Sequence, residues 1–394
     1  MKIAEFCPYA IDRPGGVQAH IRDLAVEFRR QGHDVVIIAP GGGSTAGAAV
    51  EEWRGIRILR IGAARLIGFY DTSFELTFAA GEEYRRLAAV MRDERFDVVH
   101  FHTIWTPALS LQAFRLSRAV NVATFHSTLP HSFSGRATGL VLSPLGRWLL
   151  PRLDGVIAVS ATAAANLRST SAQPVSILPP CTDLAPFMAG ASAFSRYRDG
   201  RLNILYLGRL EPRKGLLSLL EAYRRLAAER ADLRLLLAGD GPQRAELEAF
   251  VRRHALPAVE FLGRISEVDK PRWYATADLV CAPALHGESF GIVVAEAMAS
   301  GKPVTAAAND GYRRLLTGIA ADLLFPPGDA AALQNRLARL ADDAALRRAL
   351  GEWGRAAAAR YDCQAVVPQL LGLFAAATAR AAARKATPGR ARPI

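Results

Sequence analysis

The sequence predicts an α/β protein built from two doubly wound domains, each on a parallel sheet. Three observations lead to this class. The chain of 394 residues is long for a single hydrophobic core. Short β-rich runs alternate with helix-like stretches, which is the pattern of a parallel sheet with crossover helices. The same rhythm begins again after residue 200, so we expect a second domain of the same kind.

Apolar runs and turn residues set the elements and the boundaries. In the first half we predict helices at Val17–Arg30 and Glu75–Arg92. The predicted strands of this half are Lys2–Phe6, Val35–Ile38, Ile56–Arg60, Val98–Phe101, Val122–Phe125 and Val156–Val159. Those of the second half are Ile204–Leu207, Leu233–Leu237, Val259–Leu262, Leu279–Ala282 and Pro303–Thr305. Two adjacent prolines stiffen the chain at 179–180, so we predict domains at 1–180 and 201–360 with a linker at 181–200. The alanine-rich, basic stretch from residue 375 is expected to fray, which leaves 379–394 as a basic tail.

Composition narrows the class of protein and its surroundings. Apolar residues make up 51% and charged residues 22%, which is typical of a globular protein, and the net charge of +12 indicates an anionic partner. The four cysteines (Cys7, Cys181, Cys281 and Cys363) are far apart, which argues against a zinc cluster or a disulfide framework and suits a reducing cytosol. The N-terminus lacks the apolar stretch of a signal peptide, and no uninterrupted apolar run approaches ~20 residues. We therefore expect a cytoplasmic protein that can lie on the inner face of the cell membrane.

Two loops carry features of an anion site. Gly15 and Gly16 follow the first predicted strand and open a helix, where free N–H groups favour a phosphate. An ordinary strand-to-helix turn would have the same sequence. After the first strand of the second half, Arg209 and Lys214 stand where they can stabilise the charge of a departing diphosphate. The alternative there is a solvated basic loop, but the position at the end of a strand favours a site.

The segment from Gly287 to Pro303 carries two carboxylates across a glycine-rich turn into a helix. Glu288 lies in the turn, and Glu296 lies inside a helix whose other residues are mostly apolar. A buried acid needs a partner, and sugar or ribose hydroxyls are suitable ones. The backbone N–H groups of residues 290–292 would face a diphosphate at the start of this helix. An amphipathic helix with one polar side accounts poorly for Glu296.

The first half holds further candidates. His126 ends a strand and would point into a cleft, although a structural histidine is equally compatible. We interpret His100 and His102 as structural or as lining the acceptor. Between Asp97 and Asp154 there are arginines but no acidic residue. The stretch 133–153 mixes those arginines with leucines and a tryptophan, which fits either an anionic membrane surface or a helix packed on the sheet.

These motifs resemble glycosyltransferase family four, which carries a G-R-x-x-x-x-K-G loop and an E-S-F-G…E-A-M-A helix. The opening Cys7-Pro8-Tyr9 and Pro14-Gly15-Gly16-Val17-Gln18-Ala19-His20 look like the phosphatidylinositol mannosyltransferase branch. The resemblance runs from residue 1 to about 375. It implies a GT-B fold with two Rossmann-like domains facing across a cleft, a sugar-nucleotide donor, no metal or other cofactor, and retention at the anomeric carbon. It also implies that a final helix, at 361–378, crosses back to the first domain.

The resemblance also implies roles for individual residues. Arg209 and Lys214 would neutralise the diphosphate, His126 would lie beside the donor sugar and Glu288 would hold sugar hydroxyls. The donor would further contact Gly15, Gly16, Ile265, Ser289, Phe290, Gly291, Ile292 and, at the ribose, Glu296. Tyr9 and Asp12 would face the acceptor. Trp105 stands where polar residues are expected for inositol, so it suits another acceptor ring or a lipid.

We therefore predict a retaining hexosyltransferase that takes mannose from GDP-mannose to a membrane-associated glycolipid or polysaccharide precursor. No carboxylate is placed as a nucleophile, so a front-face path is expected, with the leaving diphosphate accepting the proton. The alternatives are a UDP-sugar transferase acting on a lipid or lipopolysaccharide-core acceptor, and a sugar-nucleotide 2-epimerase. A nicotinamide dehydrogenase is disfavoured because Arg244 replaces the third glycine of a G-x-G-x-x-G pattern. The chain has no nucleic-acid-binding motif, so we expect no nucleic-acid partner.

Overall fold

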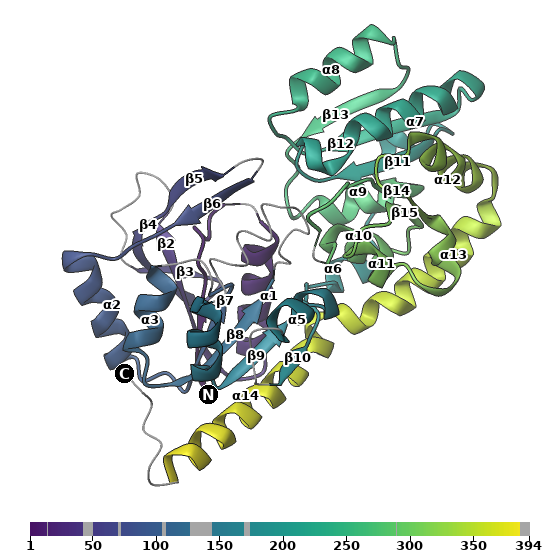
Figure 1. Ribbon diagram of the computed structural model, residues 1–394. Coiled ribbons are helices and arrows are strands. Elements are labelled where there is room, and N and C mark those ends of the chain that lie inside the picture. The colour runs from purple at the N-terminus through teal and green to yellow at the C-terminus, as the bar shows by residue number, and fades with distance from the viewer. Residues whose placement is uncertain are drawn as a thin grey trace. The chain divides into compact units, whose positions relative to one another are not determined.

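The computed structural model describes residues 1–13, 15–41, 50–69, 72–104, 108–126, 144–168, 174–288 and 290–386. They form two compact units, each with a mainly parallel sheet between helices (Figure 1). One unit comprises Met1–Thr182 together with Cys363–Ile394, and the other comprises Asp183–Asp362. The predicted class of two doubly wound α/β domains is confirmed.

The first unit is built on an eight-stranded sheet with the order β10-β9-β8-β7-β1-β2-β4-β3. All neighbours are parallel except β3 and β4. The strands are β1 (Lys2–Phe6), β2 (Asp34–Gly41), β3 (Val50–Trp53), β4 (Ile56–Ala63), β7 (Val98–His102), β8 (Val120–Phe125), β9 (Gly155–Ala158) and β10 (Val175–Ile177), with a separate hairpin of β5 (Arg65–Phe69) and β6 (Thr72–Leu76). The helices are α1 (Gly16–Arg30), α2 (Gly81–Asp93), α3 (Leu109–Leu116), η1 (Leu150–Arg152), α5 (Ala161–Arg168) and α14 (Cys363–Ala386).

The two faces of this sheet have separate cores, because successive residues of a strand point to opposite faces. Ala4 and Phe6 of β1 pack with α2, α3 and α5. Ile3 packs on the other face with α1 and α14 (Figure 1). Strands buried on both sides read as nearly continuous apolar runs, which is why the sequence located them.

The second unit has a six-stranded parallel sheet with the order β13-β12-β11-β14-β15-β16. The strands are β11 (Leu202–Leu207), β12 (Leu233–Ala238), β13 (Val259–Gly263), β14 (Leu279–Ala282), β15 (Val304–Ala307) and β16 (Leu324–Phe325). The helices are α6 (Ala185–Met188), η2 (Ser195–Tyr197), η3 (Pro212–Lys214), α7 (Leu216–Glu229), α8 (Arg244–Arg253), α9 (Lys270–Thr276), α10 (Ile292–Ala299), α11 (Tyr312–Leu315), η4 (Gly318–Leu323), α12 (Ala330–Asp342), α13 (Ala344–Ala358) and η5 (Ala359–Tyr361).

Each sheet has a point where the strand order reverses. In the first unit the chain builds outward from β1 through β2 and β4 and then returns to place β7 on the other side of β1. In the second unit β14 returns beside β11 in the same way. Ligands of open α/β sheets bind outside the carboxyl ends of the strands at such a point. The loops after β1, β7, β11 and β14 are therefore the positions to inspect for a site.

The structure differs from the predicted bounds of one helix and of the linker. The helix predicted at Glu75–Arg92 begins only at Gly81, because residues 72–76 form strand β6. Glu75 accepts hydrogen bonds from the backbone N–H of Ala10 and from Arg13, at 2.6 Å each. The linker predicted at 181–200 contains α6 and η2, and Phe187 and Tyr197 are buried in the core of the second unit. Most of that stretch is thus part of the second unit.

The expectation that the cysteines form no disulfide is also wrong. Cys181 and Cys363 are joined by a disulfide, with their Cα atoms 4.7 Å apart. They are separated by 182 positions in the sequence, so spacing along the chain could not reveal the pair. The free cysteines, Cys7 and Cys281, are both buried.

Helix α14 extends well beyond the predicted end of the last helix. Residues 379–386, which we expected to fray, are helical, because Arg380 donates to the carbonyl of Asp154 and Arg384 pairs with its carboxylate. By length and composition, Cys363–Arg384 could cross a membrane. In the structure one side of this helix, which includes Leu370 and Phe374, packs in the core of the first unit.

Candidate active site

The cationic loop predicted after the first strand of the second unit lies at the reversal point, directly after β11. The side chain of Arg209 is 62% exposed, and its nearest acid is Glu211 at 3.5 Å. Lys214 ends the short helix η3, and Gly215 after it has a φ of +71°. A Cβ at Gly215 would overlap the carbonyl oxygen of Pro283, so glycine lets this loop pack on the segment that follows β14. The loops after β11 and β14 are thereby held together.

Glu288, in the second of these loops, is the charged group that links them. Its Oε1 lies 2.5 Å from Nζ of Lys214 and 3.2 Å from a guanidinium nitrogen of Arg213. Its side chain is only 13% exposed. The structure thus brings together two of the predicted catalytic residues, Lys214 and Glu288. Sequence reasoning missed Arg213, although it lies next to Lys214.

The glycine-rich turn leads into α10 as predicted. Gly291 caps the helix with a φ of +100°, and a Cβ there would lie 2.6 Å from the ring of Tyr312. Ile292 is the first residue of α10, so its N–H and that of Gly291 are at the helix start, where an anion is favoured. Phe290 is buried and packs edge-to-face on Tyr361 at 5.1 Å. Ser289 lies outside the described residues.

Glu296 lies in the second turn of α10 and is 2% exposed. Its carboxylate already has two partners, because Nζ of Lys270 lies 2.9 Å away and the hydroxyl of Tyr274 donates at 2.8 Å. Burial raises the pKa of Glu296, and the charge of Lys270 opposes that rise. The buried acid therefore has protein partners, which the sequence interpretation did not foresee when it assigned this carboxylate to a ribose.

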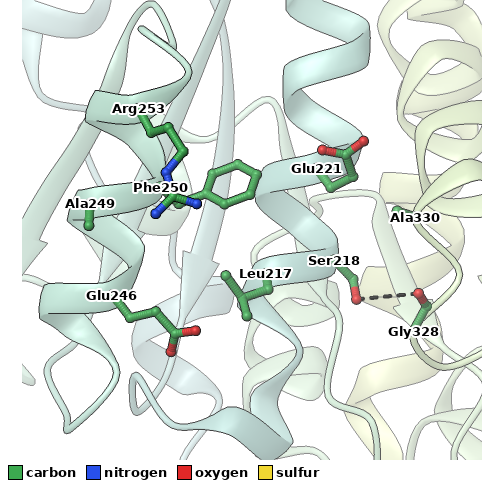
Figure 2. Close-up of a pocket in the computed structure, with 9 residues that line it drawn as sticks. All are labelled: Leu217, Ser218, Glu221, Glu246, Ala249, Phe250, Arg253, Gly328 and Ala330. Atoms are coloured by element: carbon green, nitrogen blue, oxygen red, sulfur yellow. Dashed lines mark hydrogen bonds between the residues drawn. The ribbon is translucent and has the colours of Figure 1, made fainter.

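Two further features of the second unit were considered for the donor, a predicted contact residue and a surface hollow. Ile265 follows β13 and is partly buried against the core. A surface hollow of about 520 Å³ lies between α7 and α8 and is lined by Leu217, Phe250 and Arg253 among others (Figure 2). None of the predicted site residues lines this hollow. We do not assign the donor to it.

In the first unit, the predicted anion turn opens α1. Gly15 is the N-cap in an extended conformation, with a φ of −175°, and Gly16 is the first helical residue. Both are exposed. Tyr9 is partly buried against the core. Asp12 is bound by Arg60 through two hydrogen bonds of 2.6 and 2.8 Å, so its carboxylate holds the loop after β1 to the sheet. Trp105 lies outside the described residues.

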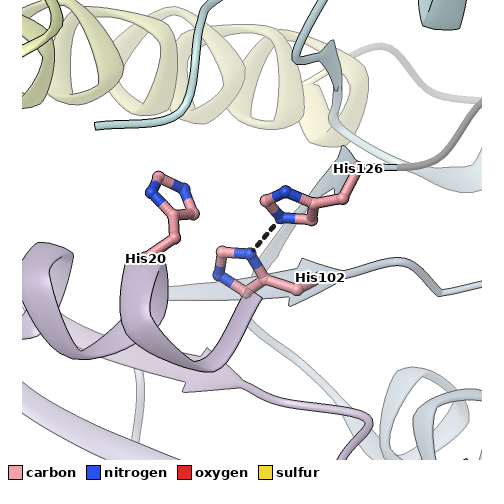
Figure 3. A group of neighbouring side chains, drawn as sticks. All are labelled: His20, His102 and His126. Carbon is pink, nitrogen blue, oxygen red and sulfur yellow. Dashed lines mark hydrogen bonds between the residues drawn. The ribbon is translucent and has the colours of Figure 1, made fainter. Parts of the chain in front are cut away.

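His126, directly after β8, is 8% exposed and belongs to a buried cluster of histidines (Figure 3). Its Nε2 lies 2.8 Å from Nδ1 of His102, and Nε2 of His102 lies 2.5 Å from Oε2 of Glu5. His100 binds the same carboxylate at 2.9 Å. His20 of α1 lies with its ring 5.2 Å from that of His126. Sequence reasoning missed both Glu5 and His20.

The basic stretch at 133–153 is described only from residue 144. Trp148 packs on Phe114 at 6.3 Å. The guanidinium groups of Arg115 and Arg152 lie over its ring at 5.7 and 4.9 Å. For this tryptophan, the structure favours packing on the domain over an exposed membrane contact.

Comparison with known proteins places this geometry in a family. The family model described as Glycosyltransferase Family 4 matches residues 14–186, and that of Glycosyl transferases group 1 matches residues 192–357. The phosphatidyl-myo-inositol mannosyltransferase of Mycobacterium leprae is 32% identical over 379 residues, which are 95% of this chain and 96% of that protein. The chain is a member of glycosyltransferase family 4. As such it is a retaining glycosyltransferase.

Other similar proteins agree with this family and its fold. The protein of the same name from Propionibacterium freudenreichii is 32% identical and covers 96% of this chain and 95% of its own. Sucrose-phosphate synthase from Thermosynechococcus elongatus has a TM-score of 0.74 at 24% identity, covering 95% of this chain and 98% of its own. Anabaena HepE in complex with UDP has a TM-score of 0.74 at 19% identity, covering 95% and 100%. The two structural matches bear on the fold alone, and they confirm the GT-B architecture of this family 4 glycosyltransferase.

Proposed function

We propose that this chain transfers mannose from GDP-mannose to phosphatidyl-myo-inositol or a closely related membrane glycolipid. The observation that carries the proposal is the 32% identity, over nearly the whole chain, with relatives named phosphatidyl-myo-inositol mannosyltransferase. The net charge of +12 suits an anionic lipid surface, where the enzyme would act as a peripheral protein on the inner face of the cell membrane.

The proposed chemistry begins at the cationic loop. When the bond between the sugar and the diphosphate breaks, negative charge grows on the diphosphate. Arg209 is exposed and Lys214 lies at the same strand end, so both can bind that charge. Hydrogen bonds to charged groups contribute roughly 1.5–3 kcal/mol each, so two of them supply about 3–6 kcal/mol if they form fully in the transition state. We propose that these cations act where other enzymes use a divalent metal.

We propose two roles for Glu288, one toward Lys214 and one toward the donor sugar. Its carboxylate holds Lys214 at 2.5 Å and would accept hydrogen bonds from hydroxyls of the donor sugar. The leaving diphosphate would take the proton of the acceptor hydroxyl, so the new bond would form on the face from which the diphosphate departs. Glu296, with its two protein partners, would act on the donor mainly by fixing α10. Tyr9 and Trp105 remain candidates for the acceptor side.

Donor binding can be tested without any lipid. The full chain is heated with GDP-mannose, UDP-glucose, UDP-galactose, UDP-N-acetylglucosamine or UDP-glucuronate, and its unfolding temperature is measured. A ligand at 100 times its Kd stabilises the folded state by about 2.7 kcal/mol, so GDP-mannose should stand out. Arg209→Ala and Glu288→Ala should reduce that shift, whereas Arg252→Ala, which replaces an exposed arginine at the end of α8, should not. EDTA should leave transfer unchanged. A shift that is equal in all variants would contradict the assigned donor site.

A UDP-sugar is the second candidate donor. The glycogen synthase of Mycobacterium tuberculosis is 30% identical over 88% of this chain, and HepE was crystallised with UDP. The same panel separates the two, since a shift with a UDP-sugar and none with GDP-mannose would favour this candidate. Conversion of the donor to an epimer without any acceptor would instead identify a 2-epimerase.

A further inference from the structure

Glu5 is a buried carboxylate in the middle of the first unit's sheet, and the proposed function does not use it. Glu5, His100 and His102 are all 0% exposed. Burying a carboxylate is costly unless hydrogen bonds or an opposite charge compensate for it. Such a residue in the strand beside the reversal point of the sheet therefore needs a reason.

Strand register brings the cluster together on one face. Glu5 of β1 is paired with His100 of β7, and His102 of β7 is paired with Thr124 of β8. Residues two apart in a strand point to the same face, so His102 follows His100, and His126 continues the row just after β8. Their neighbours Val98 and Val122 pack in the core formed with α1 and α14. The row therefore lies under those two helices.

The direction of each hydrogen bond in the row follows from its first member. Burial raises the pKa of Glu5, and the charge and hydrogen bond of His100 oppose that rise. With Glu5 ionised, its carboxylate can only accept, so Nε2 of His102 donates to it across 2.5 Å. In neutral His102, Nδ1 is then a lone pair. That nitrogen lies 2.8 Å from Nε2 of His126, which must donate to it (Figure 3). Nδ1 of His126 is consequently left as an acceptor.

We propose that Glu5 is a positioning residue which, through His102, fixes the tautomer of His126 so that Nδ1 of His126 accepts a hydrogen bond from a sugar hydroxyl. This inference rests on the proposed function, because the place of His126 beside the donor sugar comes from the family's motif. An accepting nitrogen binds a hydroxyl proton but repels a phosphate oxygen, which can itself only accept. The relay would thus hold His126 to the sugar rather than to the diphosphate.

The surroundings keep His102 and His126 neutral. Burial lowers the pKa of His102 and of His126 well below the usual range, and the neighbouring histidines lower it further. His20 is fixed in the same way, because its Nδ1 donates to the carbonyl of Cys181 at 2.9 Å. Neutral imidazoles with assigned protons form one defined pattern of donors and acceptors.

The same histidines could in principle hold a metal ion. One ligand atom from each of His20, His102 and His126 lies within 4.8 Å of the others. Two imidazole nitrogens on one tetrahedral zinc ion, each ~2.0–2.1 Å from it, lie roughly 3.4 Å apart. The 2.8 Å between His102 and His126 is instead a hydrogen-bond distance, which requires a proton between the two nitrogens. The distances therefore favour the relay, and metal binding becomes an outcome of the test.

Nuclear magnetic resonance of the full chain with ¹⁵N-labelled histidine tests the proposal, because two-bond ¹H–¹⁵N spectra distinguish the tautomers. Without any substrate, His102 and His126 should each carry the proton on Nε2. Glu5→Met should give His126 a mixture of tautomers. It should also lower kcat by up to about 100-fold with little change in the donor KM. Glu5→Gln keeps a carbonyl acceptor and should retain the single tautomer and most of kcat.

The outcomes separate this inference from the proposed function. The tautomers are read without a donor, so a wrong donor assignment leaves the spectra informative. A proton on Nδ1 of His126 in the unaltered protein overturns the proposal even if Glu5→Met does not fold. An unchanged tautomer or an unchanged kcat in Glu5→Met overturns it as well. Stoichiometric Zn²⁺ that shifts the resonances of His20, His102 and His126 together would identify a metal site instead.

Discussion

Replacing Lys270 by methionine should destabilise the second unit by about 3 kcal/mol. The carboxylate of Glu296 is 3% exposed and lies 2.9 Å from Nζ of Lys270. Removing one partner of a buried ion pair costs about 3–5 kcal/mol, because the other charge stays buried without compensation. The lower end applies because Tyr274 keeps its hydrogen bond of 2.8 Å and Lys270 itself is 14% exposed.

The pH dependence of this variant has a definite sign. Burial already raises the pKa of Glu296, and the loss of Lys270 raises it further. A carboxyl group whose folded pKa is above its unfolded value binds more protons in the folded state. The variant should therefore regain stability as the pH falls from the folded pKa towards the usual value near 4.5.

Urea unfolding of the full chain, followed by tryptophan fluorescence, measures the loss. The matched control is the double variant Lys270→Met/Glu296→Gln, which removes both charges and should recover most of the stability. If the single variant were as stable as the unaltered protein at neutral pH, Lys270 would not be the group that compensates the charge of Glu296. The carboxylate would then again be a candidate for the donor ribose.

Three further predictions follow from single contacts. Gly291→Ala should destabilise the protein by about 2–5 kcal/mol in the same urea assay, because the backbone there is left-handed and the new Cβ would overlap the ring of Tyr312. The control Gly372→Ala should be neutral or stabilising, because a Cβ at that position has no atom within 4 Å. Reducing the Cys181–Cys363 disulfide should destabilise the protein by up to about 5 kcal/mol on the chain-entropy model, because the bond closes a loop of 182 positions. Thermal unfolding with and without dithiothreitol measures this loss, and an unchanged unfolding temperature would contradict it. Burial lowers the pKa of His20 to about 4, so the stabilisation from neutral His20 is present above the unfolded pKa of 6.5 and is lost as the pH falls towards 4. Over that range the free energy of unfolding of the unaltered protein should fall by about 3 kcal/mol more than that of His20→Gln, and parallel curves of this free energy against pH would refute the prediction.

Much of the fold could be predicted because its strands are buried on both faces. Lys2–Phe6 and Leu279–Ala282 were located to the residue, as β1 and β14. The hairpin of β5 and β6 was missed, because the sequence from Glu75 onward also fits a helix. The disulfide could not be inferred, since only the folded chain brings Cys181 next to Cys363.

The site was predictable where a motif lies at a strand end and less so where partners come from elsewhere in the fold. The pair of Lys214 and Glu288 joins two loops that the sequence had singled out separately. The partners of Glu296 lie on α9, and nothing local indicates that α9 packs against α10. Glu5 is the one acidic residue of β1 and lies between the apolar residues Ala4 and Phe6, which is a readable signal. Its meaning depends on β7 being the neighbouring strand, and that follows only from the topology.

The central claim is retaining transfer of mannose to an inositol lipid. Its most direct measurement is to incubate the full chain with GDP-mannose and vesicles containing phosphatidylinositol, and to determine the anomeric configuration of the mannolipid by NMR. The account predicts a mannosyl lipid with the same α configuration as the donor, formed by the unaltered protein and Arg252→Ala but not by Arg209→Ala. A β-linked product, or consumption of GDP-mannose without any mannolipid, would contradict it.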